Sequence, residues 1–331
     1  LSPVSIEDVP AIVEAKPISL SWTTRAALAV LIVVGVLAFL QELINGDARH
    51  AWTSVHVNFT YWFCVAAASS GFAAVFQICN AQWSRPLRRI FEASLPFFIF
   101  SPLVLVVLYF GHHHLFVWAH TPIAGKASWL SSNFLYIRDI IGVLVLGYLA
   151  RKLIYLSLRR DLLAIRGGLT GLDGEKLERW NNKRYDRFVK DAGDDPKAAI
   201  AEATSLMGRF SPALVIVYAI VMTLIAFDQI MSVDPHWYST MFGGFYFMSG
   251  VYLACAFVSI AVGLLRQQSS LFRAKVERRT LWDLGKLLFG FGIFWAYLFW
   301  SHYLPIWYGN LPEETAWIIT RLRVEPWHSI A

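Results

Sequence analysis

Long apolar stretches separated by short polar segments dominate the pattern along this chain. Each stretch holds about as many apolar residues as the roughly 20 that a helix needs to cross a bilayer. Seven such stretches occur, at residues 25–44, 55–79, 94–111, 134–157, 210–230, 239–265 and 281–307. The pattern therefore predicts an all-α integral membrane protein, a polytopic helix bundle that forms a single membrane domain over residues 1–331.

Composition supports this class. Hydrophobic residues make up 56% of the 331 residues and charged residues only 16%, a balance typical of membrane proteins rather than soluble ones. The first stretch follows a leader of mixed charge instead of a basic tip, so we do not interpret it as a cleaved signal sequence.

Basic residues gather in alternate loops. Lys and Arg are frequent at 80–93, 151–209 and 266–280 and sparse in the loops between them. Positive loops stay on the cytoplasmic side of a membrane, so the N-terminus is predicted to be cytoplasmic and the segment 229–238 to face outward. The net charge of +6 then reflects membrane topology, and no basic patch with interleaved aromatic residues points to nucleic acid.

One connection, residues 158–208, is much longer than the others and is predicted to be a cytoplasmic loop. It carries many charges and an amphipathic segment near Lys197–Leu206. Two interpretations remain open: a solvated connector, or a docking surface for a neighbouring subunit. The loop is too short and too charged for an independent catalytic domain.

The segment 227–250 places polar residues between two apolar stretches. Asp228, Asp234 and His236 lie at the end of one predicted span and in the turn that follows. Ionisable groups at membrane depth are costly and usually functional. No basic loop residue lies near this turn in the sequence to neutralise it, so the turn is predicted to be essential. Replacing Asp228 with Asn is expected to lower turnover while assembly stays normal.

The predicted membrane orientation assigns the other ionisable and hydroxyl groups to an outer layer, an inner layer and the region between them. Together these groups are candidates for a proton route. These are Glu42, His56, Arg138, Asp139 and His302 in the predicted outer layer, Asp283 and Lys286 in the inner layer, and Tyr218 and Tyr252 between them. Such a route needs groups that titrate or reorient. For Arg138 and Asp139 an alternative stays open, an interfacial pair at the start of a helix.

Two inner pairs have spacings that put both members on one helix face. Arg88 and Glu92 are four residues apart, and Asp283 and Lys286 are three apart, so each pair can form an ion pair on its helix. Asp283 and Lys286 are predicted to form the cytoplasmic entry of the proton route. The alternative is that Asp283 interacts with its helix dipole while Lys286 extends toward the interface.

Histidine and cysteine positions do not indicate a cofactor site. A membrane haem needs facing His pairs well inside the spans, whereas His56 and His302 lie near the predicted outer ends. The run His112–His114 is interpreted as a solvated loop rather than a metal site. The three cysteines include no C-x-x-C, which excludes a cysteine-ligated cluster from this chain, and no nucleotide-binding loop occurs. The chain is therefore predicted to hold no redox cofactor or metal of its own.

Three stretches of the chain resemble a known family. They are Ser232-Val-Asp-Pro-His-Trp-Tyr-Ser-Thr240 with the Phe-Gly-Gly-Phe-Tyr that follows it, Asn80-Ala-Gln-Trp-Ser-Arg-Pro-Leu-Arg-Arg89 with Glu92, and Tyr308-Gly-Asn-Leu-Pro-Glu-Glu-Thr315. Over about residues 20–325 the chain resembles the NrfD/polysulfide-reductase-like membrane subunits. It is most similar to the second quinone-binding-type subunit of bacterial alternative complex III, a quinol:cytochrome c oxidoreductase.

The resemblance implies a larger assembly. Members of this family have about ten helices in two four-helix bundles plus flanking helices, so the C-terminal spans are expected to be missing from this sequence. The complex oxidises menaquinol or ubiquinol at the bacterial inner membrane, and haem c and iron–sulfur clusters are expected in partner subunits. The implied partners are a paralogous quinol-binding subunit, an iron–sulfur subunit, a multihaem cytochrome c subunit and, as a further candidate, a terminal oxidase.

Within such a complex this chain is predicted to conduct protons and to contact quinone at most, because the paralogue is the better candidate for the quinol site. Two rival functions remain. A secondary transporter for a small solute would need helices broken by Gly or Pro near the midplane in both halves, whereas Gly243, Gly244 and Pro212 lie near span ends. A purely structural scaffold for the paralogue would tolerate the loss of the outer carboxylates.

Overall fold

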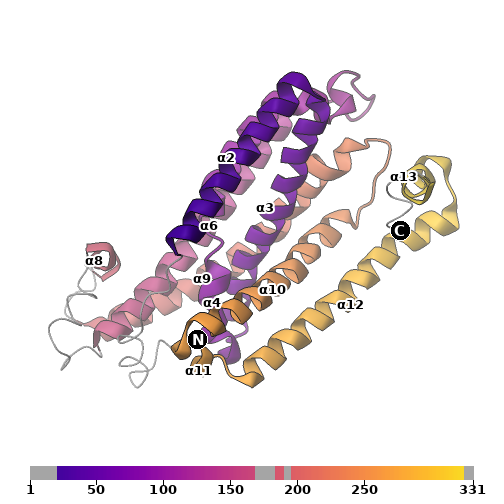
Figure 1. Ribbon diagram of the computed structural model, residues 1–331. Helices are drawn as coiled ribbons and strands as arrows, with labels where there is room; N and C mark the ends of the chain where they lie inside the picture. The colour runs from indigo at the N-terminus through magenta and orange to yellow at the C-terminus, as the bar shows by residue number, and fades with distance from the viewer. Residues whose placement is uncertain (1–20, 168–182, 190–194, 324–331) are drawn as a thin grey trace.

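The computed structural model describes residues 21–167, 183–189 and 195–323. Within these ranges the regular secondary structure is helical, with no strand. Seven of the helices are long and apolar enough to cross a membrane, and each coincides with one apolar stretch of the sequence. The protein is therefore an all-α polytopic membrane protein (Figure 1).

The long helices follow one another with short elements between them. The long ones are α2 (Trp22–Asn45), α3 (Ala48–Ile78), α5 (Phe97–Leu115), α6 (Ser132–Gly167), α9 (Pro196–Ile225), α10 (Phe242–Gln268) and α12 (Arg278–Gly309). The short ones are α4 (Arg85–Glu92), α8 (Lys183–Val189), α11 (Ser270–Lys275), α13 (Pro312–Arg323), the 3₁₀ turns η2 (Gln82–Ser84), η3 (Val117–Ala119) and η5 (Met231–Val233), and the π-helical segment η4 (Ala226–Ile230).

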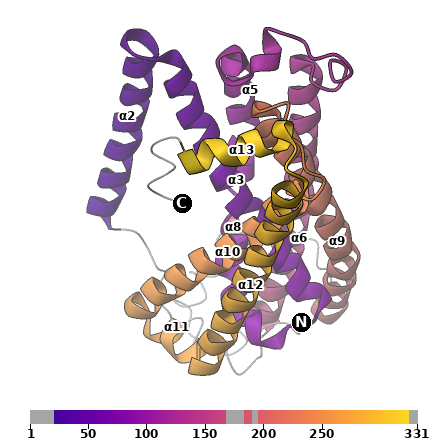
Figure 2. The same cartoon turned by 90° about the vertical axis from the view of Figure 1, so that its right-hand side faces the viewer.

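Helix α3 is the centre of the fold. In its most apolar part 83% of the residues are buried, against 0% for α2 and 11% for α12. Helices α3, α5, α6 and α9 form a ring in which each packs against the next, while α10 packs against α3 and α9, and α12 packs against α10. Figure 1 shows α12 on one flank of the bundle and Figure 2 shows α2 on another. Both flanking helices thus keep apolar surface for lipid or other subunits.

The ring is one four-helix bundle, and the second bundle that the resemblance implies stays a prediction. Helices α2, α5, α9 and α12 finish at one end of the molecule, because consecutive long helices alternate in direction (Figure 1). In the predicted orientation this end faces outward, and it is termed the predicted outer end below. The orientation itself also stays a prediction.

The predicted loop 158–208 is shorter than the sequence pattern indicates. Helix α6 continues to Gly167, and α9 begins at Pro196, where the Asp195 side chain accepts hydrogen bonds from two backbone amides. The predicted boundaries are therefore wrong, because these helices extend beyond their apolar parts on charged surfaces. The amphipathic segment is confirmed as the first turns of α9, where Ala199 and Ala203 are buried. Residues 168–182 and 190–194 lie outside the described residues.

Small residues let α10 lie close to α3. A Cβ atom on Gly250 would lie 2.8 Å from Cys64 Sγ and 3.0 Å from Ala68 Cβ. We therefore expect Gly250→Ala to lower the free energy of unfolding by about 1–3 kcal/mol, because the two helices must separate. Gly263→Ala on the same helix, where an added Cβ meets no atom within 4 Å, is the matched control and should lose no stability, because alanine is the better helix former. Denaturant titration in detergent micelles measures both, and equal stability of the two variants would contradict the close approach.

Candidate functional site

Helix α9 ends in a π-helical segment that places two polar side chains inside the bundle. Asp228 and Gln229 of η4 are both completely buried. Consecutive helical residues point about 100° apart, so the two side chains meet different partners. Asp228 bonds to Arg138 of α6, while Gln229 bonds to α6 through Asp139 and to α3 through His56. Because π-helical segments occur frequently at functional sites, this segment is a candidate functional site.

Asp228 forms a two-pronged ion pair with Arg138. The guanidinium Nε donates to Asp228 Oδ2 at 2.5 Å and Nη2 donates to Oδ1 at 2.5 Å. Trp129 Nε1 also donates to Oδ1, at 3.2 Å, and the guanidinium carbon lies 3.9 Å from the centre of a Trp129 ring. Paired hydrogen bonds to a carboxylate and stacking on an aromatic ring are both typical of arginine. The buried charge of Asp228 is thus fully paired.

A second carboxyl lies beside this pair. Gln229 Nε2 donates to Asp139 Oδ2 at 2.7 Å, and Gln229 Oε1 lies 3.2 Å from His56 Nε2. Asp139 is only 1% exposed, so the alternative of an interfacial pair at a helix start does not describe it. Arg138, Asp139, Asp228, Gln229 and His56 are together termed the outer polar cluster.

The outer polar cluster combines two carboxyl groups with one guanidinium. Asp139 interacts electrostatically with Asp228, and Asp139 Oδ1 has no hydrogen-bond partner in the part of the chain that the structure describes. With both carboxyls ionised and His56 neutral, the cluster carries one net negative charge, and one added proton makes it neutral. Because a net charge in a buried site is costly, the cluster is suited to taking up and releasing one proton.

A polar stripe continues from His56 along α3. It consists of hydroxyl and thiol groups that α3, α9, α10 and the α4–α5 turn contribute, namely Thr60, Cys64, Ser69, Ser70, Ser94, Tyr218 and Tyr246. Tyr246 donates to the carbonyl of Thr60 at 2.6 Å, and the Oγ atoms of Ser70 and Ser94 lie 3.2 Å apart. Several of these groups donate to backbone carbonyls, so proton transfer along the stripe requires that they rotate or that water lies between them.

At the other end of the stripe lies an inner ion cluster. Arg88 Nε donates to Glu92 Oε1 at 2.8 Å, which confirms the predicted pair, and Arg88 Nη1 donates to Gln77 Oε1 at 3.0 Å. Arg89 pairs with Glu92 and, at 2.5 Å, with Asp161 of α6. Burial lowers the pKa of the Arg88 guanidinium, and the neighbouring Glu92 raises it, so Glu92 offsets part of the cost of burying the Arg88 charge.

The polar turn after α9 is not one site. Asp228 is buried, whereas Asp234 and His236 are exposed. The expectation that no basic residue neutralises the turn is wrong, because Arg138 pairs with Asp228, and Lys126 donates to a backbone carbonyl of the turn at 2.8 Å. These partners are 90 and 109 residues away in the sequence, so the residues next to the turn give no sign of them.

Several predicted residues lie outside the outer polar cluster. His302 is half-buried, and its Nδ1 lies 2.7 Å from Ser239 Oγ, which ties α12 to the turn before α10. Glu42 lies 3.3 Å from His50 at the predicted outer end of α2 and α3. Tyr252 of α10 is half-buried and packs toward α12. The structure thus brings together only part of the predicted set.

The predicted inner entry lies on a flank of the bundle, and its role stays a prediction. Asp283 and Lys286 pair at 3.4 Å, as their spacing predicts. Their side chains are 25% and 62% exposed, and they lie on the flanking helix α12, apart from the polar stripe. The buried carboxyl at the same predicted end of the bundle is Glu92, in the inner ion cluster.

The run His112–His114 belongs to the last turn of α5, so its placement in a loop is wrong. His112 is buried and its Nδ1 lies 2.5 Å from the carbonyl of Tyr109, whereas His113 and His114 are exposed. Among the described residues no group of three His, Cys, Asp or Glu side chains could hold a metal ion.

Comparison with known proteins adds no assignment. No family model matches this chain, and no curated protein sequence matches it. The fold and the buried clusters define the class, a multi-pass membrane protein with ionisable groups enclosed in its bundle. A more specific function therefore has to be inferred from the geometry and from the resemblance of the three stretches.

Proposed function

We propose that this chain is a proton-conducting subunit of a quinol-oxidising respiratory complex in the bacterial inner membrane. The observation that carries the proposal is the position of Asp139, which Gln229 joins to His56 beside the completed Arg138–Asp228 pair. An ion pair alone would serve to hold two helices together. The second buried carboxyl, Asp139, has a desolvation cost and no cation of its own, because Arg138 is already paired with Asp228. We therefore assign Asp139 a role in proton exchange.

The proposed route runs the length of α3. It begins at the buried carboxyl of Glu92, passes Ser94 and Ser70, and follows the polar stripe to His56 and Asp139. Carboxyl, hydroxyl and imidazole groups are the ones that can carry protons through a membrane protein. The route therefore links the two ends of the ring formed by α3, α5, α6 and α9.

Helix continuity favours this function over solute transport. A transporter of the broken-helix type has spans interrupted near the midplane. Helices α3 and α6 instead run without a break for 31 and 36 residues, and Pro212 lies inside α9 without ending it. Among the described residues, the one π-helical segment follows α9 at the predicted outer end, at the outer polar cluster.

Quinol oxidation also needs an electron acceptor, which we assign to other subunits. The resemblance supports haem c and iron–sulfur clusters in partner subunits, with a paralogous subunit at the quinol site and menaquinol or ubiquinol as the substrate of the complex. This chain then supplies the proton route and, through its lipid-facing surfaces, contact with its neighbours.

The subunit composition tests this proposal. When the complex is purified through a tag on this chain, we expect haem and iron to co-purify and a haem absorption band to appear. The chain separated from its partners should show neither signal, and should not oxidise quinol. Stoichiometric haem in the separated chain, or purification of the native chain without any haem or iron-containing partner, would overturn the proposed function.

A further inference from the structure

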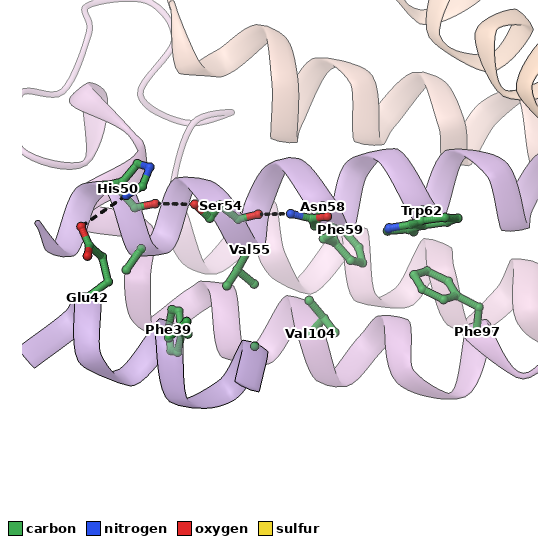
Figure 3. A pocket seen from close by; sticks show the side chains of 13 residues that line it. Phe39, Glu42, His50, Ser54, Val55, Asn58, Phe59, Trp62, Phe97 and Val104 are labelled. Carbon is green, nitrogen blue, oxygen red and sulfur yellow. Dashed lines mark hydrogen bonds and ion pairs between the residues drawn. The ribbon is translucent and has the colours of Figure 1, made fainter. Parts of the chain in front are cut away.

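A lateral pocket lies between α2, α3 and α5, apart from the proton route (Figure 3). Its volume is about 550 Å³, which is within the range of small-molecule sites. Gly35 and Ala38 provide the space on α2, and a Cβ atom added to Gly35 would meet no atom within 4 Å. The pocket is lined by residues that belong neither to the outer polar cluster nor to the polar stripe.

The pocket is long and narrow. Its lining on α3 extends from His50 to Trp62, which are about 18 Å apart at the rise of an α-helix. Spread over this length, the volume of about 550 Å³ gives a mean cross-section of about 30 Å². A helix of another subunit, with a cross-section of about 80 Å², is too wide for this space, whereas a hydrocarbon chain fits. The length is close to the roughly 15 Å of one half of the hydrocarbon core of a bilayer.

The two ends of the pocket differ in polarity. Glu42 and His50 lie together at one end, where the short connection joins α2 to α3. Figure 3 shows Trp62 and Phe97 at the other end, and Phe59 adds to the apolar wall between. The connection lies at a membrane surface, because both helices are long enough to span a bilayer. A polar group at the surface and an apolar wall toward the midplane match the order of groups in a phospholipid.

Polar side chains further along α3 already have partners. Ser54 Oγ donates to the carbonyl of His50 at 2.9 Å, and Asn58 Nδ2 donates to the carbonyl of Ser54 at 2.9 Å (Figure 3). Covering a polar group is costly mainly when its hydrogen bonds are lost. A hydrocarbon chain can therefore lie over Ser54 and Asn58 at little cost.

The polar end offers a carboxylate to a headgroup. Glu42 Oε1 lies 3.3 Å from His50 Nδ1 and accepts a hydrogen bond from the backbone amide of Asp47 at 3.4 Å. Within the described residues both of these contacts are made by Oε1, so Oε2 can accept a hydrogen bond from a ligand. The Glu42 side chain is 41% exposed, so a headgroup can reach it. Arg49, which is exposed and adjoins His50 in the chain, provides a cation for a phosphate at the same end.

We propose that this pocket holds an acyl chain of a phospholipid with a primary ammonium headgroup, whose N–H group donates a hydrogen bond to Glu42. Hydrogen bonds to an ionised acceptor are among the strong ones. A choline headgroup carries the same charge but has no N–H donor, and a phosphatidylglycerol would bring a net negative charge toward Glu42. The proposal concerns lipid binding alone and does not rest on the proton route, since the two sites share no residue.

Competition between lipids on the unmodified chain tests the recognition of the headgroup. The full chain is purified in detergent, stripped of lipid and mixed with equal amounts of dioleoyl-phosphatidylethanolamine and dioleoyl-phosphatidylcholine. Native mass spectrometry then counts each lipid on the chain, because the two differ in mass. We expect one tightly held phosphatidylethanolamine per chain and a preference over phosphatidylcholine of at least about tenfold, because only the first donates a hydrogen bond to a charged acceptor. Dioleoyl-phosphatidylglycerol in place of phosphatidylcholine should also lose the competition.

Two pairs of variants locate the site. Glu42→Ala should remove the preference, whereas Glu202→Ala, which removes an exposed carboxylate from the first turns of α9, should retain it. Gly35→Leu should lower the binding of both lipids at least about tenfold by filling the pocket. Val33→Leu is its matched control, because Val33 lies on the same helix and is 56% exposed; its lipid binding should equal that of the unmodified chain.

Equal binding of phosphatidylethanolamine and phosphatidylcholine by the unmodified chain would overturn the proposal, as would a preference that persists in Glu42→Ala or normal binding by Gly35→Leu. A preference for phosphatidylglycerol would assign the pocket to an anionic lipid and overturn it as well. If Gly35→Leu did not fold, the lipid competition and Glu42→Ala would still decide the matter. None of these measurements uses quinol or a partner subunit, so their failure is distinct from a failure of the proposed function.

Discussion

Replacing Arg138 with Gln is expected to lower the free energy of unfolding by about 3–5 kcal/mol, because the completely buried carboxylate of Asp228 loses its only ion-pair partner within the described residues. The stacking of the guanidinium on Trp129, at 3.9 Å, is lost with it. Denaturant titration of the chain in detergent micelles, followed by circular dichroism, measures the change.

Two controls separate the ion pair from a general effect of losing charge. Arg25→Gln removes an exposed arginine and should change stability by less than about 0.5 kcal/mol. The double variant Arg138→Gln/Asp228→Asn should recover most of the loss, because the Asp228 carboxylate is removed together with its ion-pair partner. Equal stability of Arg138→Gln and Arg25→Gln would show that the buried pair contributes nothing.

The ion pair also changes what a substitution of Asp228 can reveal. The sequence alone predicts that Asp228→Asn lowers turnover with normal assembly, because no basic loop residue lies near Asp228 in the sequence. Because Arg138 would lose its charged partner, assembly and proton chemistry would be affected together. Asp139 is the cleaner probe, since asparagine there keeps an acceptor oxygen for Gln229.

The spans could be predicted from the sequence because bilayer thickness imposes a length on each apolar stretch. All seven predicted stretches coincide with helices. The ends of the helices were less predictable, because the hydrogen bonding of a helix continues past its apolar part. Helix α6 extends to Gly167, and helix α9 already begins at Pro196. Asp195, with proline directly after it at the first helical position, is the local signal that could have placed the second boundary.

The candidate site was predicted residue by residue but not as an arrangement. Asp228, Asp139, Arg138 and His56 stood out as ionisable groups in apolar surroundings, and all four lie in the outer polar cluster. Their pairing depends on how α3, α6 and α9 are rotated against each other, which a single sequence does not contain. The π-helical segment that turns Gln229 toward both neighbours likewise has no signature in the apolar pattern.

Replacing Asp139 with Asn should decrease proton movement coupled to quinol oxidation about a hundredfold, the usual scale for losing a positioned acid or base. The substitution keeps the size of the side chain and its acceptor for Gln229, and removes the carboxyl to which we assign proton exchange beside the paired Asp228. The intact complex in proteoliposomes is supplied with quinol, and electrons and protons are counted in the same sample. We expect the ratio of protons to electrons to fall while the complex remains fully assembled.

Asp283→Asn is the matched control, because it removes a carboxyl of the same type from the half-exposed pair on α12. The ratio of protons to electrons should stay unchanged in this variant, since the inner ion cluster around Glu92 provides the buried carboxyl at that end of the stripe. If Asp283→Asn instead lowered the ratio and Asp139→Asn did not, protons would enter along α12. The proposed proton route along α3 would then be wrong. The outer polar cluster would serve only to hold α6 against the end of α9.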